Sequence, residues 1–225
     1  MQKNFIVAID GPSGAGKSTI ARRLAAHLGG VYVDTGALYR AVAVYIKQRG
    51  VSPENEAEIA RCLSAAPPAI ELRQGADGQC VFLNGIEVTR EIRLPELSTL
   101  TSKIAQSSAV RAFLLDAQRQ AARSAPFAVL DGRDIGTVVL PDAPVKIFLT
   151  ASAEARAERR TAELLAQGVS VRYEDILRDN IARDKRDAVR TTAAPGAYIV
   201  DTSALSFDES FDKILDEVLR VREKE

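Results

Sequence analysis

The sequence predicts a doubly wound α/β fold, in which a mostly parallel sheet is covered by helices and carries a small antiparallel β insert. Short apolar runs alternate with helical segments along most of the 225 residues, which is the pattern of a parallel sheet. Three of these runs end at an aspartate, namely Asp10, Asp131 and Asp201. The length suits one domain that carries a small insertion.

The first third of the chain shows the alternation clearly. Phe5–Ile9 is apolar throughout, so we expect a strand buried on both faces. Lys17–Leu28 has helical composition and stops at Gly29-Gly30. Val31–Val33 predicts a second strand, and Ala37–Gln48 a second helix.

The middle of the chain differs, because turn signals there separate short strands. Pro53–Leu63 predicts a helix. Three strands are then expected, at Ala69–Leu72, Cys80–Leu83 and Ile86–Val88. Gly75-Ala76-Asp77-Gly78 and Asn84-Gly85 have the composition of hairpin turns. We therefore expect a small antiparallel insert over residues 66–93, within a core made of residues 1–65 and 94–225.

The remainder returns to alternating elements. Glu96–Ala122 predicts helix, with a break near Ser107-Ser108. Strands are expected at Phe127–Leu130, Val145–Leu149 and Ala197–Val200. Helices are expected at Ala153–Gln167, Tyr173–Val189 and Phe207–Arg222.

Composition argues against several classes of protein. Thirty basic and thirty acidic side chains balance, whereas a general nucleic-acid binder is usually basic, so we expect no nucleic-acid partner. Cys62, Cys80 and the single His27 do not have the spacing of a zinc site. No run of 18 apolar residues occurs, so we expect no membrane association and a cytoplasmic protein.

The strongest motif is a phosphate-binding loop that follows the first strand and precedes the first helix. It comprises Gly11, Pro12, Ser13, Gly14, Ala15, Gly16, Lys17, Ser18 and Thr19. Backbone N–H groups in such a loop surround phosphate oxygens, the lysine reaches the terminal phosphates, and the serine hydroxyl suits Mg²⁺. The alternative, a glycine-rich turn, does not account for the flanking strand and helix. We therefore expect ATP and Mg²⁺ as cofactors, with Ser18 as the metal ligand.

The class of nucleotide-binding protein follows from length and from the arginines. No Asn-Lys-x-Asp guanine motif occurs, and the chain is short for a remodelling ATPase. Arg183, Arg186, Asp187 and Arg190 have the spacing of one helix face, and Arg156, Arg159 and Arg160 form a second cluster. Each cluster is either a solvated charged face or a source of positive charge for phosphoryl transfer. The second alternative predicts a kinase with a helical lid near residues 156–190.

Two further motifs follow strands, at the edge of a parallel sheet where ligands bind. Asp131-Gly132-Arg133-Asp134 follows one strand, and Asp34-Thr35-Gly36-Ala37-Leu38-Tyr39-Arg40 follows another. The first could be an acidic turn, and in the second Asp34 or Thr35 could cap a helix. We expect Thr35 and Asp131 to contact the acceptor substrate.

These blocks together resemble the bacterial cytidylate kinases along nearly the whole chain. The resemblance rests on Ile9–Thr19, Asp34–Arg40, Asp131–Val139 and Pro141–Lys146. It implies a P-loop nucleoside monophosphate kinase that transfers the γ-phosphoryl group of ATP to CMP or dCMP. It implies contacts from Tyr39, Arg40, Arg111, Arg133, Arg183 and Arg190 to the acceptor nucleotide.

The same resemblance implies that Ser102, Arg111 and Asp134 recognise cytosine and that Asp187 contacts the sugar. A carboxylate suits the amino donor that distinguishes cytosine from uracil. We expect Lys17, Arg133, Arg183 and Arg190 to act in catalysis, and the protein to be a monomer. Two alternatives remain, a P-loop kinase for another small acceptor and a non-catalytic nucleotide sensor.

Overall fold

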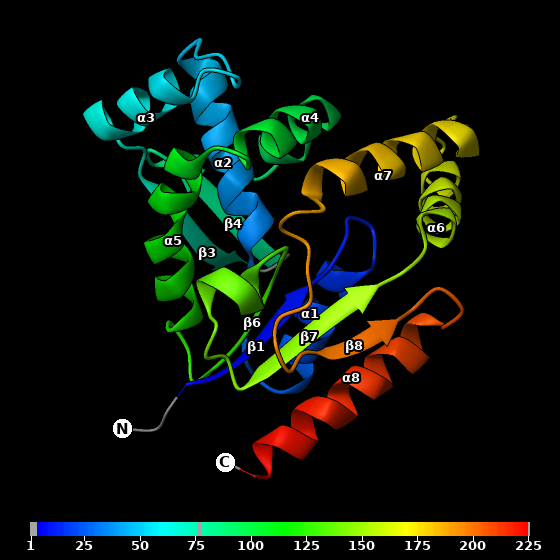
Figure 1. Cartoon of the computed structure of the whole chain (residues 1–225). Coiled ribbons are helices and arrows are strands. Elements are labelled where there is room, and N and C mark those ends of the chain that lie inside the picture. Colours follow the sequence, from blue (N-terminus) through cyan, green and yellow to red (C-terminus); the bar gives the residue numbers. More distant parts are fainter. Residues whose placement is uncertain (1–3, 76–77, 225) are drawn as a thin grey trace. The chain divides into compact units, whose positions relative to one another are not determined.

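The computed structural model describes residues 4–75 and 78–224 and divides the chain into two compact units. The core unit comprises Met1–Tyr32 and Ala125–Glu225, and the inserted unit comprises Val33–Ser124. Figure 1 shows the elements of both units, coloured along the sequence.

The core unit is built on a five-stranded sheet with the order β2-β6-β1-β7-β8. The strands are β1 (Phe5–Asp10), β2 (Val31–Asp34), β6 (Phe127–Gly132), β7 (Val145–Thr150) and β8 (Tyr198–Asp201). Strand β1 lies centrally and pairs in parallel with β6 and with β7, and β7 pairs in parallel with β8. The predicted parallel α/β sheet is confirmed.

Alternate residues of the strands point to the same face of the sheet, and helices α1 (Lys17–His27) and α8 (Phe207–Arg222) pack on the apolar ones. Val7, Ile9 and Val129 are fully buried against α1 and α8. Full burial of such a side chain contributes about 1.5–3 kcal/mol. The π-helix η2 (Ile135–Val139) contacts β1 and β6. The core of this unit therefore lies directly beneath the loops at the carboxyl ends of its strands.

Helices α6 (Ala153–Ala166) and α7 (Tyr173–Asp187) follow β7 and pack against each other (Figure 1). Ser152 caps α6 by accepting a hydrogen bond from the amide of Ala155. None of the described α7 side chains is fully buried, which fits its highly charged sequence. The predicted helix to Val189 ends instead at Asp187, so Arg190 lies in the turn that follows.

The inserted unit packs four helices with a three-stranded antiparallel sheet. Its elements are α2 (Thr35–Gln48), α3 (Glu56–Ala65), β3 (Ile70–Gly75), β4 (Gly78–Leu83), β5 (Ile86–Glu87), the 3₁₀ helix η1 (Glu91–Arg93), α4 (Pro95–Ile104) and α5 (Ser108–Ala122). Helix α2 is apolar around most of its circumference, as expected of a helix in the centre of a core.

The antiparallel strands expected in the middle of the chain are confirmed, as is the break before α5, where Ser107 caps the helix. Helix α3 begins at Glu56 rather than Pro53, because the Asn55 side chain accepts from the amide of Glu58. The expected turn residues Ala76 and Asp77 lie outside the described residues. The functional division into a 66–93 insert and a 156–190 lid stays a prediction, while the inserted unit as a whole is larger, Val33–Ser124.

Within the described ranges, none of the helices combines the length and apolar character needed to cross a membrane.

Candidate active site

The phosphate-binding loop connects β1 to α1 as predicted, and its backbone explains its glycines. Gly11 has φ +146°, and a Cβ atom there would lie 1.9 Å from the carbonyl oxygen of Leu149. Gly16 occupies the left-handed region, with φ +89°, immediately before α1. A side chain at either position would force the loop out of this path.

Lys17 is buried in the loop with an exposed fraction of 6%, and its Nζ donates to the carbonyl of Pro12 at 2.7 Å. Burial lowers the pKa of Lys17 far below its ordinary value, and the positive charge of Arg133 lowers it further, whereas Asp131 and Asp10 oppose the shift. An ammonium group held in this way gains stabilisation when phosphate oxygens arrive. Its environment fits a polyphosphate ligand.

Asp131, near the end of β6, is hydrogen-bonded to the phosphate-binding loop. Its carboxylate accepts from the hydroxyl of Ser18 at 2.7 Å and from the hydroxyl of Tyr32 at 2.9 Å. A serine hydroxyl and a carboxylate beside a phosphate loop are oxygen donors of the kind that Mg²⁺ prefers. The residues therefore fit a magnesium ion. Tyr32 was not predicted, because a tyrosine on a buried strand gives no signal that its hydroxyl reaches a carboxylate.

Two of the predicted arginines meet on one carboxylate. Asp187 accepts from Arg133 Nε at 3.3 Å and from Arg190 Nη2 at 2.8 Å. The side chains of Asp187 and Arg190 are each 14% exposed, and that of Arg133 is 30% exposed. Arg183 donates to the Ser13 hydroxyl of the phosphate loop at 3.4 Å. Positive charge from the end of β6 and from α7 is therefore gathered near the loop.

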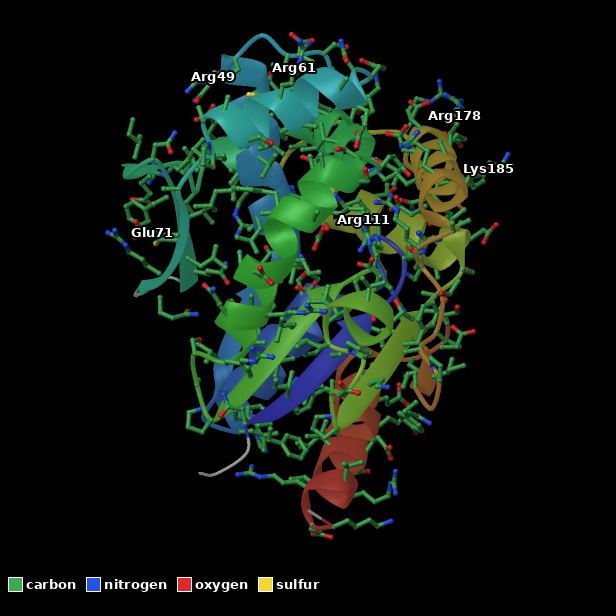
Figure 2. The ribbon with its side chains drawn as sticks, turned by 60° about the vertical axis from the view of Figure 1, so that its left-hand side comes forward. Arg49, Arg61, Glu71, Arg111, Arg178 and Lys185 are labelled. Atoms are coloured by element: carbon green, nitrogen blue, oxygen red, sulfur yellow. The ribbon has the colours of Figure 1, made fainter. Side chains whose placement is uncertain are left out.

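A pocket in the core unit opens onto the same elements. The residues that line it include Pro12 of the phosphate loop, Thr150 of β7, and Asp184 and Asp187 of α7. The other face of α7 is exposed, with Arg178 and Lys185 projecting outward (Figure 2). Arg186 is also exposed, so the predicted face of Arg183, Arg186, Asp187 and Arg190 is divided between two environments.

The second arginine cluster is held by the protein itself. Arg156 is buried and donates to the carbonyls of Ser13 at 2.8 Å and Ala151 at 3.0 Å, and it pairs with Asp184. Arg159 donates to the Thr202 hydroxyl and carbonyl. Arg160 pairs with Glu163 on the exposed side of α6. Of these three, Arg156 contacts the phosphate loop, through its bond to the Ser13 carbonyl.

The inserted unit carries the other predicted acceptor residues on three helices. Thr35, Tyr39 and Arg40 lie on α2 and Ser102 on α4. Arg111 lies on α5 and is labelled in Figure 2. Helices α4 and α5 both pack on α2. Thr35 is buried and the other four side chains are half-buried. The structure therefore brings these residues into one packed unit.

The amino end of α2 has two supports. Asp34 accepts from the amide of Ala37 at 3.0 Å, which confirms the expected cap. The amide of Asp34 donates to Gln79 of β4 at 3.1 Å. The antiparallel sheet thus fixes the segment that carries Thr35, although nothing in the sequence linked Gln79 to it.

The sequence model of the family described as cytidylate kinase matches residues 7–220. The chain belongs to the cytidylate kinase family. A cytidylate kinase of Carboxydothermus hydrogenoformans is 46% identical over 214 residues, which cover 93% of this chain and 95% of that protein. A cytidylate kinase of Thermosipho melanesiensis is 46% identical over 213 residues, covering 93% and 94%.

Solved structures support the fold. A gluconokinase from Sinorhizobium meliloti superposes with a TM-score of 0.51 at 16% identity, covering 100% of this chain and 97% of that one. At this identity the likeness concerns architecture alone. The predicted P-loop kinase fold is confirmed.

Proposed function

We propose that this cytidylate kinase family member transfers the γ-phosphoryl group of ATP to CMP or dCMP, giving ADP and CDP or dCDP. The observation that carries the proposal is the gathering of Lys17, Arg133 and Arg190 in one unit beside a loop shaped for phosphate. Family membership over residues 7–220 supports the choice of a cytidine nucleotide as acceptor.

The transfer requires positioning and charge neutralisation more than covalent chemistry. Lys17 contacts the terminal phosphates of ATP, and the backbone N–H groups that the phosphate-binding loop offers surround them. Arg133, Arg183 and Arg190 stabilise the negative charge of the migrating phosphoryl group. The phosphate of the acceptor is itself the nucleophile, so no general base is needed.

Ser18 and Asp131 are the residues that would hold Mg²⁺, directly or through water. The ion would supply neutralisation of the β- and γ-phosphate oxygens. Tyr32 keeps the Asp131 carboxylate in position by donating to the oxygen that Ser18 does not contact.

In this proposal the acceptor nucleotide takes contacts from the side chains that the resemblance to the cytidylate kinases implies. The phosphate is contacted by arginines, whose planar guanidinium suits it. The arginines assigned to this role are Arg40, Arg111, Arg133, Arg183 and Arg190. Thr35 and Tyr39 contribute further contacts, with residues 66–93 as part of the acceptor-binding insert.

Base and sugar recognition are assigned to other side chains. The Asp134 carboxylate accepts a hydrogen bond from the amino group of cytosine. Ser102 and Arg111 make further hydrogen bonds to the base, and Asp187 contacts the ribose. Asp187 pairs with Arg133 and Arg190 in the structure, so nucleotide binding exchanges these ion pairs for contacts to sugar and phosphate. Helices α6 and α7, over residues 156–190, act as the lid, and the protein works as a monomer.

The test is ADP formation from ATP and Mg²⁺ with separate acceptors, namely CMP, dCMP, UMP, AMP, GMP, dTMP and shikimate. Turnover with CMP and dCMP and little with the purine nucleotides is the expected result. Turnover with another acceptor would indicate a P-loop kinase of different specificity, and turnover with none would favour a nucleotide sensor.

A further inference from the structure

Asp10 is a buried acidic side chain to which the proposed chemistry assigns no role. It is the last residue of β1 and immediately precedes Gly11, the first residue of the phosphate loop. Its exposed fraction is 2%. Its two carboxylate oxygens accept hydrogen bonds from the backbone amides of Ile135 and Gly136, both at 2.7 Å.

These two amides begin the π-helix η2, directly after Arg133 and Asp134. The first amides of a helix have no partner within it, and here the Asp10 carboxylate supplies one for each. Single-turn π-helices are rare and occur often at functional sites. The link joins the start of the phosphate loop to the segment that carries two proposed substrate-binding residues.

A side chain at Gly136 would crowd its surroundings at this contact. A Cβ atom there would lie 3.2 Å from Ala194 Cβ and 3.4 Å from Asp10 Oδ2. It would also lie 3.4 Å from Lys146 Cδ. A Cβ atom would therefore require Ala194 to give way by a few tenths of an ångström and would touch the Asp10 carboxylate at ordinary van der Waals distance, so alanine here shifts η2 slightly without removing the Asp10 charge.

The arrangement is costly, since an ionised carboxylate is removed from water. Burial raises the pKa of Asp10 to about 6, while the bonds from Gly136 and Ile135 lower it. Among neighbouring charges, Asp134 raises this pKa and Lys17 lowers it. An uncharged side chain would avoid the desolvation, but only a carboxylate accepts from both amides without presenting a donor to either.

We propose that Asp10 is a positioning residue, whose carboxylate holds the Ile135 and Gly136 amides and thereby fixes Arg133 and Asp134 relative to the phosphate loop. This inference rests on the proposed function of Arg133 and Asp134 in binding the acceptor nucleotide. The rival account is a purely structural cap, whose loss would lower stability without a selective effect on the acceptor.

The first arm of the experiment tests the link without using activity. In ¹⁵N-labelled protein, the amide protons of Ile135 and Gly136 are expected to lie downfield and to move upfield together when Asp10 is changed to Asn. Amide resonances that stay in place in Asp10→Asn would overturn the link itself.

The second arm measures KM for CMP and KM for ATP in Asp10→Asn and Gly136→Ala. Both variants are expected to raise the acceptor KM about tenfold, since small displacements of binding groups are costly. Gly136→Ala retains the Asp10 charge near Lys17, so its KM for ATP is expected to stay within about twofold of the wild-type value. Its acceptor effect is therefore free of any change in the charge around Lys17.

Val129→Ala is the control, because Val129 is fully buried in β6 and the acceptor for both amides is Asp10. It is expected to lower the unfolding temperature while leaving the ratio of the two KM values unchanged. If the wild type forms CDP but both Asp10→Asn and Gly136→Ala keep the wild-type KM for CMP, the positioning role is overturned. The proposed function stands in that case. Absence of CDP formation by the wild type would instead overturn both.

Discussion

Helices α6 and α7 are both rich in arginine, yet the structure gives their arginines different partners. Arg156 of α6 is buried and donates to the backbone carbonyls of Ser13 and Ala151. Beyond the end of α7, Arg190 pairs with the carboxylate of Asp187, and Arg183 of α7 donates to the Ser13 hydroxyl of the phosphate loop.

The difference separates anchored arginines from exchangeable ones. A backbone carbonyl in the core stays where it is when a ligand binds, so an arginine held by carbonyls supports the fold. A carboxylate or hydroxyl partner can be replaced by a phosphate, which accepts the same hydrogen bonds with more charge. Positive charge alone does not distinguish the two classes, and neither does a carboxylate partner, since Arg156 also pairs with Asp184; what distinguishes Arg156 is that backbone carbonyls hold it as well.

The largest expected effect comes from removing an exchangeable arginine. Arg190→Met is expected to lower kcat/KM for CMP by about 10³-fold, as loss of a charge-stabilising group does in other enzymes. The free energy of unfolding should change by no more than about 1 kcal/mol, because Asp187 keeps Arg133 as a partner. Steady-state kinetics and denaturant unfolding measure the two quantities. Intact activity would remove Arg190 from the exchangeable class.

Removing an anchored arginine should show the opposite pattern. Arg156→Met is expected to lower the free energy of unfolding by about 3 to 4 kcal/mol, because buried carbonyls and Asp184 lose their donor. Arg160→Met is the matched control on the same helix. Since Arg160 and Glu163 are each more than half exposed, that change should cost less than about 0.5 kcal/mol. Equal stability of the two variants would refute the anchored role.

Asp10 is also held by backbone groups, and the pH dependence of stability tests its burial. Burial raises the pKa of the Asp10 carboxyl in the fold from its ordinary value of 3.8 to about 6, so ionisation of this group opposes folding. The stability of the wild type relative to Asp10→Asn should therefore be greatest below pH 4 and fall by about 3 kcal/mol as pH rises through 6. The charged groups that act on this carboxyl are Asp134, which raises its pKa, and Lys17, which lowers it.

Denaturant unfolding of both proteins between pH 3.5 and 7.5 measures this difference. A constant difference across that range would show that Asp10 is not the buried acid described here.

The smallest expected effect concerns specificity. Asp134→Asn is expected to reduce the preference for CMP over UMP by about tenfold. The carboxylate accepts from the amino group of cytosine, which uracil lacks, and an uncharged side chain distinguishes the two bases less well. The ratio of kcat/KM for the two nucleotides is the measurement. An unchanged ratio would assign cytosine recognition to other residues.

The fold could be predicted from the sequence to a large extent, because apolar strands, glycine stops and hairpin turns are local signals. The parallel core, the antiparallel strands and the break before α5 follow from them. The π-helix η2 could not be predicted, since its first amides depend on Asp10, more than 120 residues away in the sequence. The boundaries of the inserted unit also depend on how α2 packs with later helices.

The candidate site was predictable where a motif carries its own chemistry, as with Lys17 and Ser18. It was less so for residues whose role depends on a distant partner. Tyr32 and Gln79 have ordinary places in strands and gain meaning only through Asp131 and Asp34. The roles of Arg156 and Arg190 could not be separated by sequence either, since spacing on a helix does not report that backbone carbonyls of Ser13 and Ala151 hold Arg156.

Formation of CDP from ATP, Mg²⁺ and CMP by the wild type and by Lys17→Ala, purified in parallel, tests the central claim most directly. The account predicts steady CDP formation by the wild type and a loss of about 10³-fold or more in the variant, because the terminal phosphates lose their cation. CDP formation at the wild-type rate by Lys17→Ala, or none by the wild type, would contradict it.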